Sequence, residues 1–112
     1  MLIPLTGHTR GHAGVAIQTP EGWLLHAGDA YFYRHEMDAA NRHCSPGLRA
    51  YQWMMEVDRK ARLHNQDRLY ALSSDRSDVR LFCSHDAIEF KAFAEQLDVS
   101  QAEQIYASNR NA

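Results

Sequence analysis

The stretch from Gly14 to Asp29 limits the fold most strongly, because it has the pattern of two strands joined by a tight turn. Residues 14–19 and 23–27 are rich in apolar residues that favour strands. Pro20-Glu21-Gly22 lies between them, with proline and glycine at positions that suit a turn. The sequence therefore predicts a β-hairpin, and Gly28-Asp29 ends its second strand.

Further elements are predicted on both sides of the hairpin. Residues 2–5 indicate the end of an edge strand, because Pro4 lacks an N–H group. Residues 30–46 show little periodicity and predict a long loop, and long ordered loops are often functional. The remaining predicted elements are a helix over 48–64, a short helix through 69–72 capped by Asn65 or Asp67, a strand over 79–83, a helix over 87–97 and a weaker helix over 99–112. We expect Trp53-Met54-Met55 in the core or at an interface.

Length and composition fit one small domain and exclude several functions. The 112 residues are 45% hydrophobic and 23% charged, which is ordinary for a globular domain. A net charge of −2 gives no reason to expect nucleic-acid binding. No apolar run approaches the roughly 20 residues that span a membrane, and the N-terminus lacks a signal peptide's features, so a cytoplasmic location is expected. Cys44 and Cys83 form no Cys-x-x-Cys pair and are expected to be reduced thiols.

Motifs that contain histidine or aspartate recur where predicted strands end and loops begin. Gly7-His8-Thr9-Arg10-Gly11-His12 follows the first strand, Asp29 follows the hairpin, and Ser84-His85-Asp86 follows strand 79–83. Side chains at the ends of separate strands can converge on one place. Imidazole and carboxylate groups suit zinc, with iron or manganese as alternatives, and a metal-bound water ionises near neutral pH. The pattern therefore indicates a metal-hydrolase site.

Taken in order, these motifs resemble the later part of metallo-β-lactamase-fold hydrolases, especially the glyoxalase II and quorum-lactonase branches. The likeness rests on 7–12, on Trp23-Leu24-Leu25-His26-Ala27-Gly28-Asp29 and on Phe82-Cys83-Ser84-His85-Asp86. It covers nearly the whole chain, at least from residue 5 to about residue 93. The resemblance implies an α/β fold, half of an αβ/βα sandwich, with a small, mainly antiparallel sheet and helices packed on one face.

The resemblance also implies roles for particular residues. His8 matches the histidine that completes the first metal site, Asp29 the aspartate that bridges two metals, and His85 the histidine of the second site. The candidates for support of these ligands or for a place in the pocket are His12, His35 and Asp86. The catalytic residues are not identified by the motifs.

The chain departs from the family pattern in one large respect. The family's His-x-His-x-Asp-His motif is absent from the sequence, and with it go several expected ligands. We therefore expect residues 1–112 to form a single domain like the C-terminal half of the fold. Without its companion sheet, one sheet face should be apolar and exposed, which favours a homodimer or higher oligomer.

Two functional hypotheses follow, and each ligand also has an ordinary interpretation. The first is a truncated, oligomeric protein without full hydrolase activity. The alternative is a hydrolase of esters, thioesters or lactones whose site is completed by another chain, such as a separate N-terminal half. Without a metal, His8 is a backbone-bonded loop residue, Asp29 a turn or cap aspartate, and His85 a strand-end residue that caps the next helix.

Overall fold

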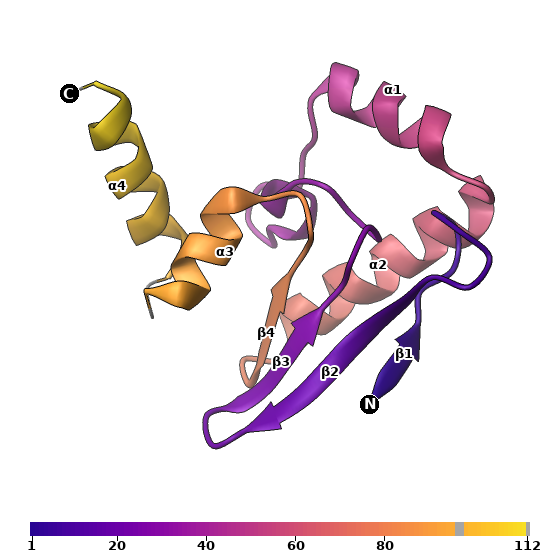
Figure 1. Ribbon diagram of the computed structural model, residues 1–112, viewed down its shortest axis with the longest axis horizontal. Helices are drawn as coiled ribbons and strands as arrows, with labels where there is room; N and C mark the ends of the chain where they lie inside the picture. Colours follow the sequence, from indigo (N-terminus) through magenta and orange to yellow (C-terminus); the bar gives the residue numbers. More distant parts are fainter. Residues whose placement is uncertain (96–97, 112) are drawn as a thin grey trace.

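A four-stranded open sheet organises the computed structural model, which describes residues 1–95 and 98–111 (Figure 1). Its strands lie side by side in chain order: β1 (Leu2–Pro4), β2 (Ala13–Thr19), β3 (Gly22–His26) and β4 (Val79–Phe82). The first three are antiparallel, whereas β4 runs parallel to β3, with Trp23 opposite Val79. The predicted α/β class, with a mainly antiparallel sheet, is confirmed, and β1 is an edge strand.

The hairpin of β2 and β3 divides its side chains between two faces. Ala16 pairs with Leu25 and both are buried, whereas Ile17 pairs with Leu24 on the opposite face. Gly22 has a φ of 129°, and an added Cβ would collide with the carbonyl of Asp78. The hairpin turn therefore needs glycine where the chain enters β4 beside it.

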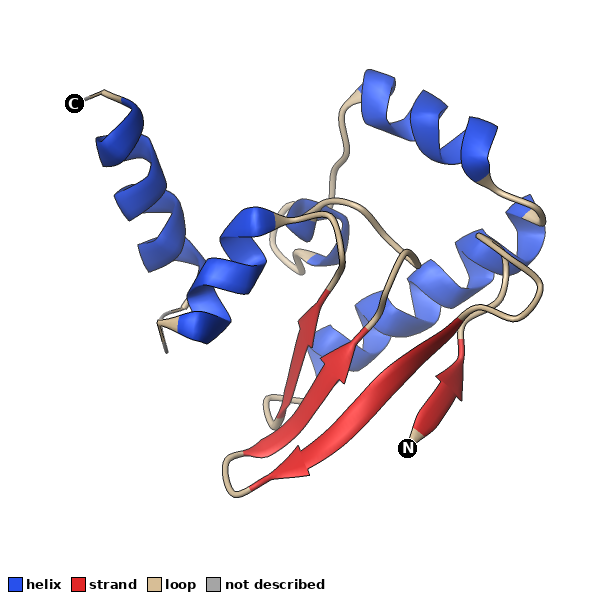
Figure 2. Ribbon diagram, viewed as in Figure 1, coloured by secondary structure: helices blue, strands red, loops and turns tan. Residues whose placement is uncertain are grey.

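In the described part of the chain, five helical segments accompany the sheet (Figure 2). The 3-10 helix η1 (Arg34–Met37) and α1 (Pro46–Met55) lie in the long connection from β3, followed by α2 (Arg59–Asp75); α3 (Ala87–Ala94) and α4 (Val99–Arg110) follow β4. Helix α2 crosses one face of the sheet. Its Leu69 joins Leu5, Leu25 and Tyr31 in the buried core.

The helices in the connection between β3 and β4 differ from the sequence prediction. The helix expected over 48–64 is broken between Met55 and Arg59. The N–H groups of Val57 and Asp58 both donate to the Gly7 carbonyl at 2.9 Å, which turns the chain there. The Asp58 carboxylate then caps α2 by accepting from Ala61 N. The second short helix is also wrong, because α2 continues without interruption to Asp75.

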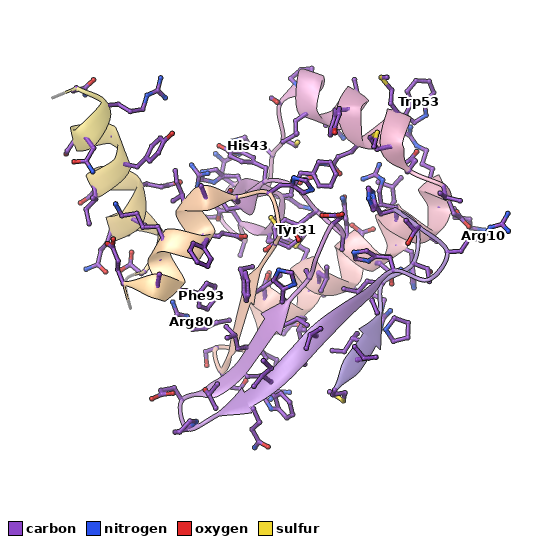
Figure 3. All side chains as sticks on the ribbon, viewed as in Figure 1. Arg10, Tyr31, His43, Trp53, Arg80 and Phe93 are labelled. Carbon is purple, nitrogen blue, oxygen red and sulfur yellow. The ribbon has the colours of Figure 1, made fainter. Side chains whose placement is uncertain are left out.

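Two predicted helices at the C-terminal end include residues that the structure does not describe, and the prediction for residues 53–55 on α1 is corrected. Helix α3 ends at Ala94, and residues 96–97 of the helix predicted over 87–97 lie outside the described residues. Helix α4 agrees with the helix expected over 99–112, whose last residue is likewise not described. Trp53 is 58% exposed and Met54 73%, so they do not belong to the core. In Figure 3 Trp53 points away from the rest of the molecule.

On the sheet face opposite α2, the part formed by β1 and β2 is apolar and open. Leu2, Val15 and Ile17 lie on it with exposed fractions of 72%, 40% and 54%. Helix α3 lies against the β4 side of this face, where Phe93 packs on Phe82 with ring centroids 4.7 Å apart. None of the helices in the described part of the chain is long and apolar enough to cross a membrane.

Candidate metal centre

The loop between β1 and β2 is held in a fixed shape that presents His8. Leu5 N donates to the His12 carbonyl at 2.9 Å, which closes the loop at its base. The Gly7 carbonyl accepts the two N–H groups at the start of α2, and Gly7 has a φ of 132° against the Arg62 backbone. No side chain fits there. These contacts fix the loop that carries His8.

His12 links this loop to the end of β3. Its Nδ1 lies 2.7 Å from the Leu5 carbonyl, which can only accept, so Nδ1 carries the hydrogen. Its Nε2 accepts from Asp29 N at 2.9 Å. Both ring nitrogens are therefore engaged, and His12 positions Asp29 rather than offering a free ligand atom.

The ends of β3 and β4 bring Asp29 and His85 together. Ser84 N donates to the Gly28 carbonyl at 2.9 Å, and Ala27 N donates to the Phe82 carbonyl at 2.8 Å. These bonds continue the parallel pairing beyond the strands. They place His85 Nε2 2.8 Å from Asp29 Oδ1.

The carboxylate of Asp29 lies between the two candidate histidines. His8 Nε2 is 3.3 Å from Oδ2, whereas His85 Nε2 faces Oδ1. Each carboxylate oxygen thus has one imidazole nitrogen beside it. The structure brings all three candidate ligands together from the β1–β2 loop, the end of β3 and the end of β4.

Aromatic side chains surround this cluster. Phe32 is 5% exposed, and its ring centroid lies 4.3 Å from that of His85 and 5.9 Å from that of His8. A cleft of about 510 Å³ opens beside His85, with Phe32, Tyr51 and Tyr106 among its lining residues. His85 therefore lies in the lining of a cleft that contains several aromatic side chains. Phe32 carried no signal in the sequence, because an aromatic residue in a loop is most often core.

The donor set fits divalent transition metals, within limits. Ligands of tetrahedral zinc at about 2.0–2.1 Å from the ion lie roughly 3.4 Å apart, close to the separation of His8 Nε2 and Asp29 Oδ2. Among the described residues, no group of three His, Cys, Asp or Glu side chains is arranged to hold one ion. The described contacts are instead two separate pairs that share Asp29, one with His8 and one with His85.

Asp86 lines the cleft beside His85, whereas His35 lies elsewhere. Asp86 is 6% exposed, caps α3 through Ile88 N and Glu89 N, and pairs with Arg34 at 3.0 Å. It therefore fixes the helix that follows His85. His35 lies between Asp38 Oδ2 and Glu103 Oε1, at 3.2 and 3.0 Å, and lines a different cavity from the one beside His85.

A buried acid that sequence reasoning missed supports the site from the core side. Both Glu89 oxygens accept from the Tyr31 hydroxyl, and Oε2 also accepts from Cys83 N at 2.9 Å. Burial raises the pKa of Glu89 to about 7 and raises that of Tyr31 well above its ordinary value. The pair joins the segment after Asp29 to the segment before His85 (Figure 3 labels Tyr31).

The structure thus combines a mixed α/β sheet with histidine and carboxylate groups at its strand ends. Comparison with curated proteins connects the chain with metallo-hydrolases. A probable metallo-hydrolase of Mycobacterium bovis and one of Mycobacterium tuberculosis are each 36% identical to the chain over 87 residues, 77% of its length. The chain is thus similar to part of these probable metallo-hydrolases, as its motifs predicted.

The match is partial with respect to the relatives. The chain spans 28% of the length of the curated relatives it matches. No family model matches the sequence, and no solved structure matches it.

Proposed function

We propose that this chain supplies three ligands, His8, Asp29 and His85, to a metal-dependent hydrolase site and lacks full hydrolase activity alone. The observation that carries the proposal is the Asp29 carboxylate, which has one imidazole at each oxygen. A carboxylate so placed suits a bridge between two ions. Zinc fits these donors best, with iron or manganese as alternatives.

The residues around the ligands have defined tasks in this proposal. His12 holds the Asp29 backbone, and Phe32 packs against the His85 ring. When bound, the metal would supply an activated water and polarise a carbonyl group. The substrate class, esters, thioesters or lactones, follows from the family resemblance. The aromatic cleft beside His85 offers room for the apolar part of such a molecule.

Metal titration tests the proposal directly. We expect Zn²⁺ to bind in calorimetry to protein purified without chelator, and His8→Ala, Asp29→Asn and His85→Ala each to weaken binding about tenfold or more. The control is His64→Ala, which removes an exposed histidine on α2. Equal affinity in the ligand variants and the control would contradict the proposal.

The open sheet face supports association with a second copy of the chain. Leu2, Val15 and Ile17 form an apolar surface of the kind that single domains seldom leave uncovered. We propose that the protein self-associates through this face as a homodimer or higher oligomer. Association would also shield the exposed edge of β1.

A second candidate function is a hydrolase completed by another chain. The much greater length of the metallo-hydrolase relatives favours it, because their additional residues have room for the remaining ligands. Mixing this protein with a chain that carries the His-x-His-x-Asp-His motif should then create thioesterase or lactonase activity. That activity should require His8 and His85. Unchanged background hydrolysis, with a stable complex formed, would reject this candidate.

A further inference from the structure

A second cavity, separate from the cleft at His85, has a distinctly basic lining. It measures about 400 Å³ and lies between α1, α2 and the loop that follows η1. Four arginines, from three segments, line it: Arg42, Arg49, Arg59 and Arg62. Its carboxylates are Glu36 and Asp67. The cavity belongs to none of the motifs that point to a metal.

Two of the arginines are neutralised within the protein. Arg62 pairs with Glu56 and donates to Gln52 Oε1 at 2.8 Å, where it is buried. Arg42 pairs with Asp67 Oδ1 at 2.8 Å and lies over the Tyr70 ring. These two guanidinium groups are held in place and build the wall of the cavity.

The acidic and thiol groups of the lining do not neutralise the other two arginines. Glu36 Oε2 accepts from Phe32 N and Tyr33 N, and its Oε1 accepts from Gln52 Nε2 at 2.9 Å. Its charge is thus met by three N–H donors. Burial raises the pKa of Cys44 to about 11, so the thiol is uncharged at neutral pH.

Arg49 and Arg59 remain, one on each helix. No hydrogen bond or ion pair joins either guanidinium to another residue in the described part of the chain. Arg59 is the first residue of α2, where the helix dipole adds positive potential. Two unpaired, exposed guanidinium groups in the lining of one cavity suit a doubly charged oxyanion, whose geometry matches the arginine fork.

We propose that this cavity binds a small dianionic ligand, the phosphate group of a phosphate ester, between Arg49 and Arg59. The remaining lining suits the rest of such a molecule, because Gln52 and Gln66 are polar and Leu63 is apolar. This site is independent of the metal ligands. It gives the protein a binding function that does not require completion of the hydrolase site.

Inorganic phosphate is the probe that tests the proposal. At constant ionic strength, amide shifts in ¹⁵N NMR spectra should saturate on α1, at the start of α2 and at Cys44. The double variant Arg49→Gln/Arg59→Gln should bind about tenfold more weakly or worse, because charge-assisted hydrogen bonds are lost. The matched control Arg10→Gln/Arg110→Gln removes the same charge from exposed positions outside the cavity lining; Figure 3 shows Arg10 pointing outward.

The remaining outcomes separate this site from general charge and from the metal centre. Affinity retained in His85→Ala supports a site independent of the metal ligands, whereas its loss there overturns the proposal. If both double variants lose phosphate affinity equally, the binding reflects only the overall positive charge, and this result also overturns the proposal. Circular dichroism of both variants verifies that the exposed substitutions leave the fold intact.

Discussion

At the scale of single residues, Gly28 determines whether Asp29 can be held correctly. Its φ is 59°, and an added Cβ would stand 2.7 Å from His12 Nε2. Gly28→Ala should therefore lose about 2 kcal/mol or more of unfolding free energy, from left-handed strain and from displacement of His12. Urea unfolding measures this loss.

Gly11→Ala, in the loop between β1 and β2 that carries His12, is the control for that substitution. Its Cβ would meet nothing within 4 Å, so a change within about 0.5 kcal/mol is expected. Similar losses in the two variants would show that His12 does not depend on the space at Gly28.

Glu89 should give the stability of the protein a pH dependence of unusual sign. Its pKa is about 7 in the folded protein against an ordinary 4.5, so the folded state holds this proton more tightly. The contribution of Glu89 is present below about pH 4.5 and is lost as pH rises towards 7. The loss amounts to about 3 kcal/mol at most, from a shift of roughly 2.5 units.

Glu89→Gln should flatten this part of the stability profile, measured by urea unfolding at pH 4.5, 6 and 7.5. The amide keeps an oxygen for Cys83 N and carries no titrating charge. Glu21→Gln, in the exposed hairpin turn, should retain the wild-type profile. A Glu89→Gln profile parallel to that of the wild type would show that the buried pair does not titrate in this range.

At the scale of elements, the start of α2 supports both the helix and the His8 loop. Asp58→Ala removes the side-chain acceptor for Ala61 N and should cost about 1 kcal/mol. Asp75→Ala is the matched control at the other end of α2, where a negative charge opposes the helix dipole. Thermal unfolding should therefore show a lower melting temperature for Asp58→Ala than for Asp75→Ala. If Asp75→Ala proved equally costly, the cap would not explain the effect.

The elements also show which features the sequence could predict. The hairpin and β4 were predicted because alternation and turn residues act locally. The break between α1 and α2 was missed because its cause is remote: Val57 and Asp58 donate to Gly7, far away in the chain. The proximity of His8, Asp29 and His85 could be expected from strand ends, whereas the packing of Phe32 between them depends on the folded loop.

At the scale of the whole molecule, the open face of the sheet governs association. If copies pack there, Ile17→Lys should shift the protein towards monomer in analytical ultracentrifugation, because a charge replaces a 54% exposed apolar side chain. Val57→Lys alters a similarly exposed residue away from the sheet and should leave the oligomer unchanged. A wild-type protein that stays monomeric at high concentration would refute self-association.

The parallel pairing of β3 and β4 has a consequence for how the protein folds. Trp23 meets Val79 only after the whole connection through α1 and α2 has been closed, and such distant contacts form slowly. Asp29 and His85 are joined by that same pairing, so the candidate ligands assemble at a late step. A metal ion would then bind the completed fold and not the earlier intermediates. The rate of metal uptake would therefore report the rate at which folding is completed.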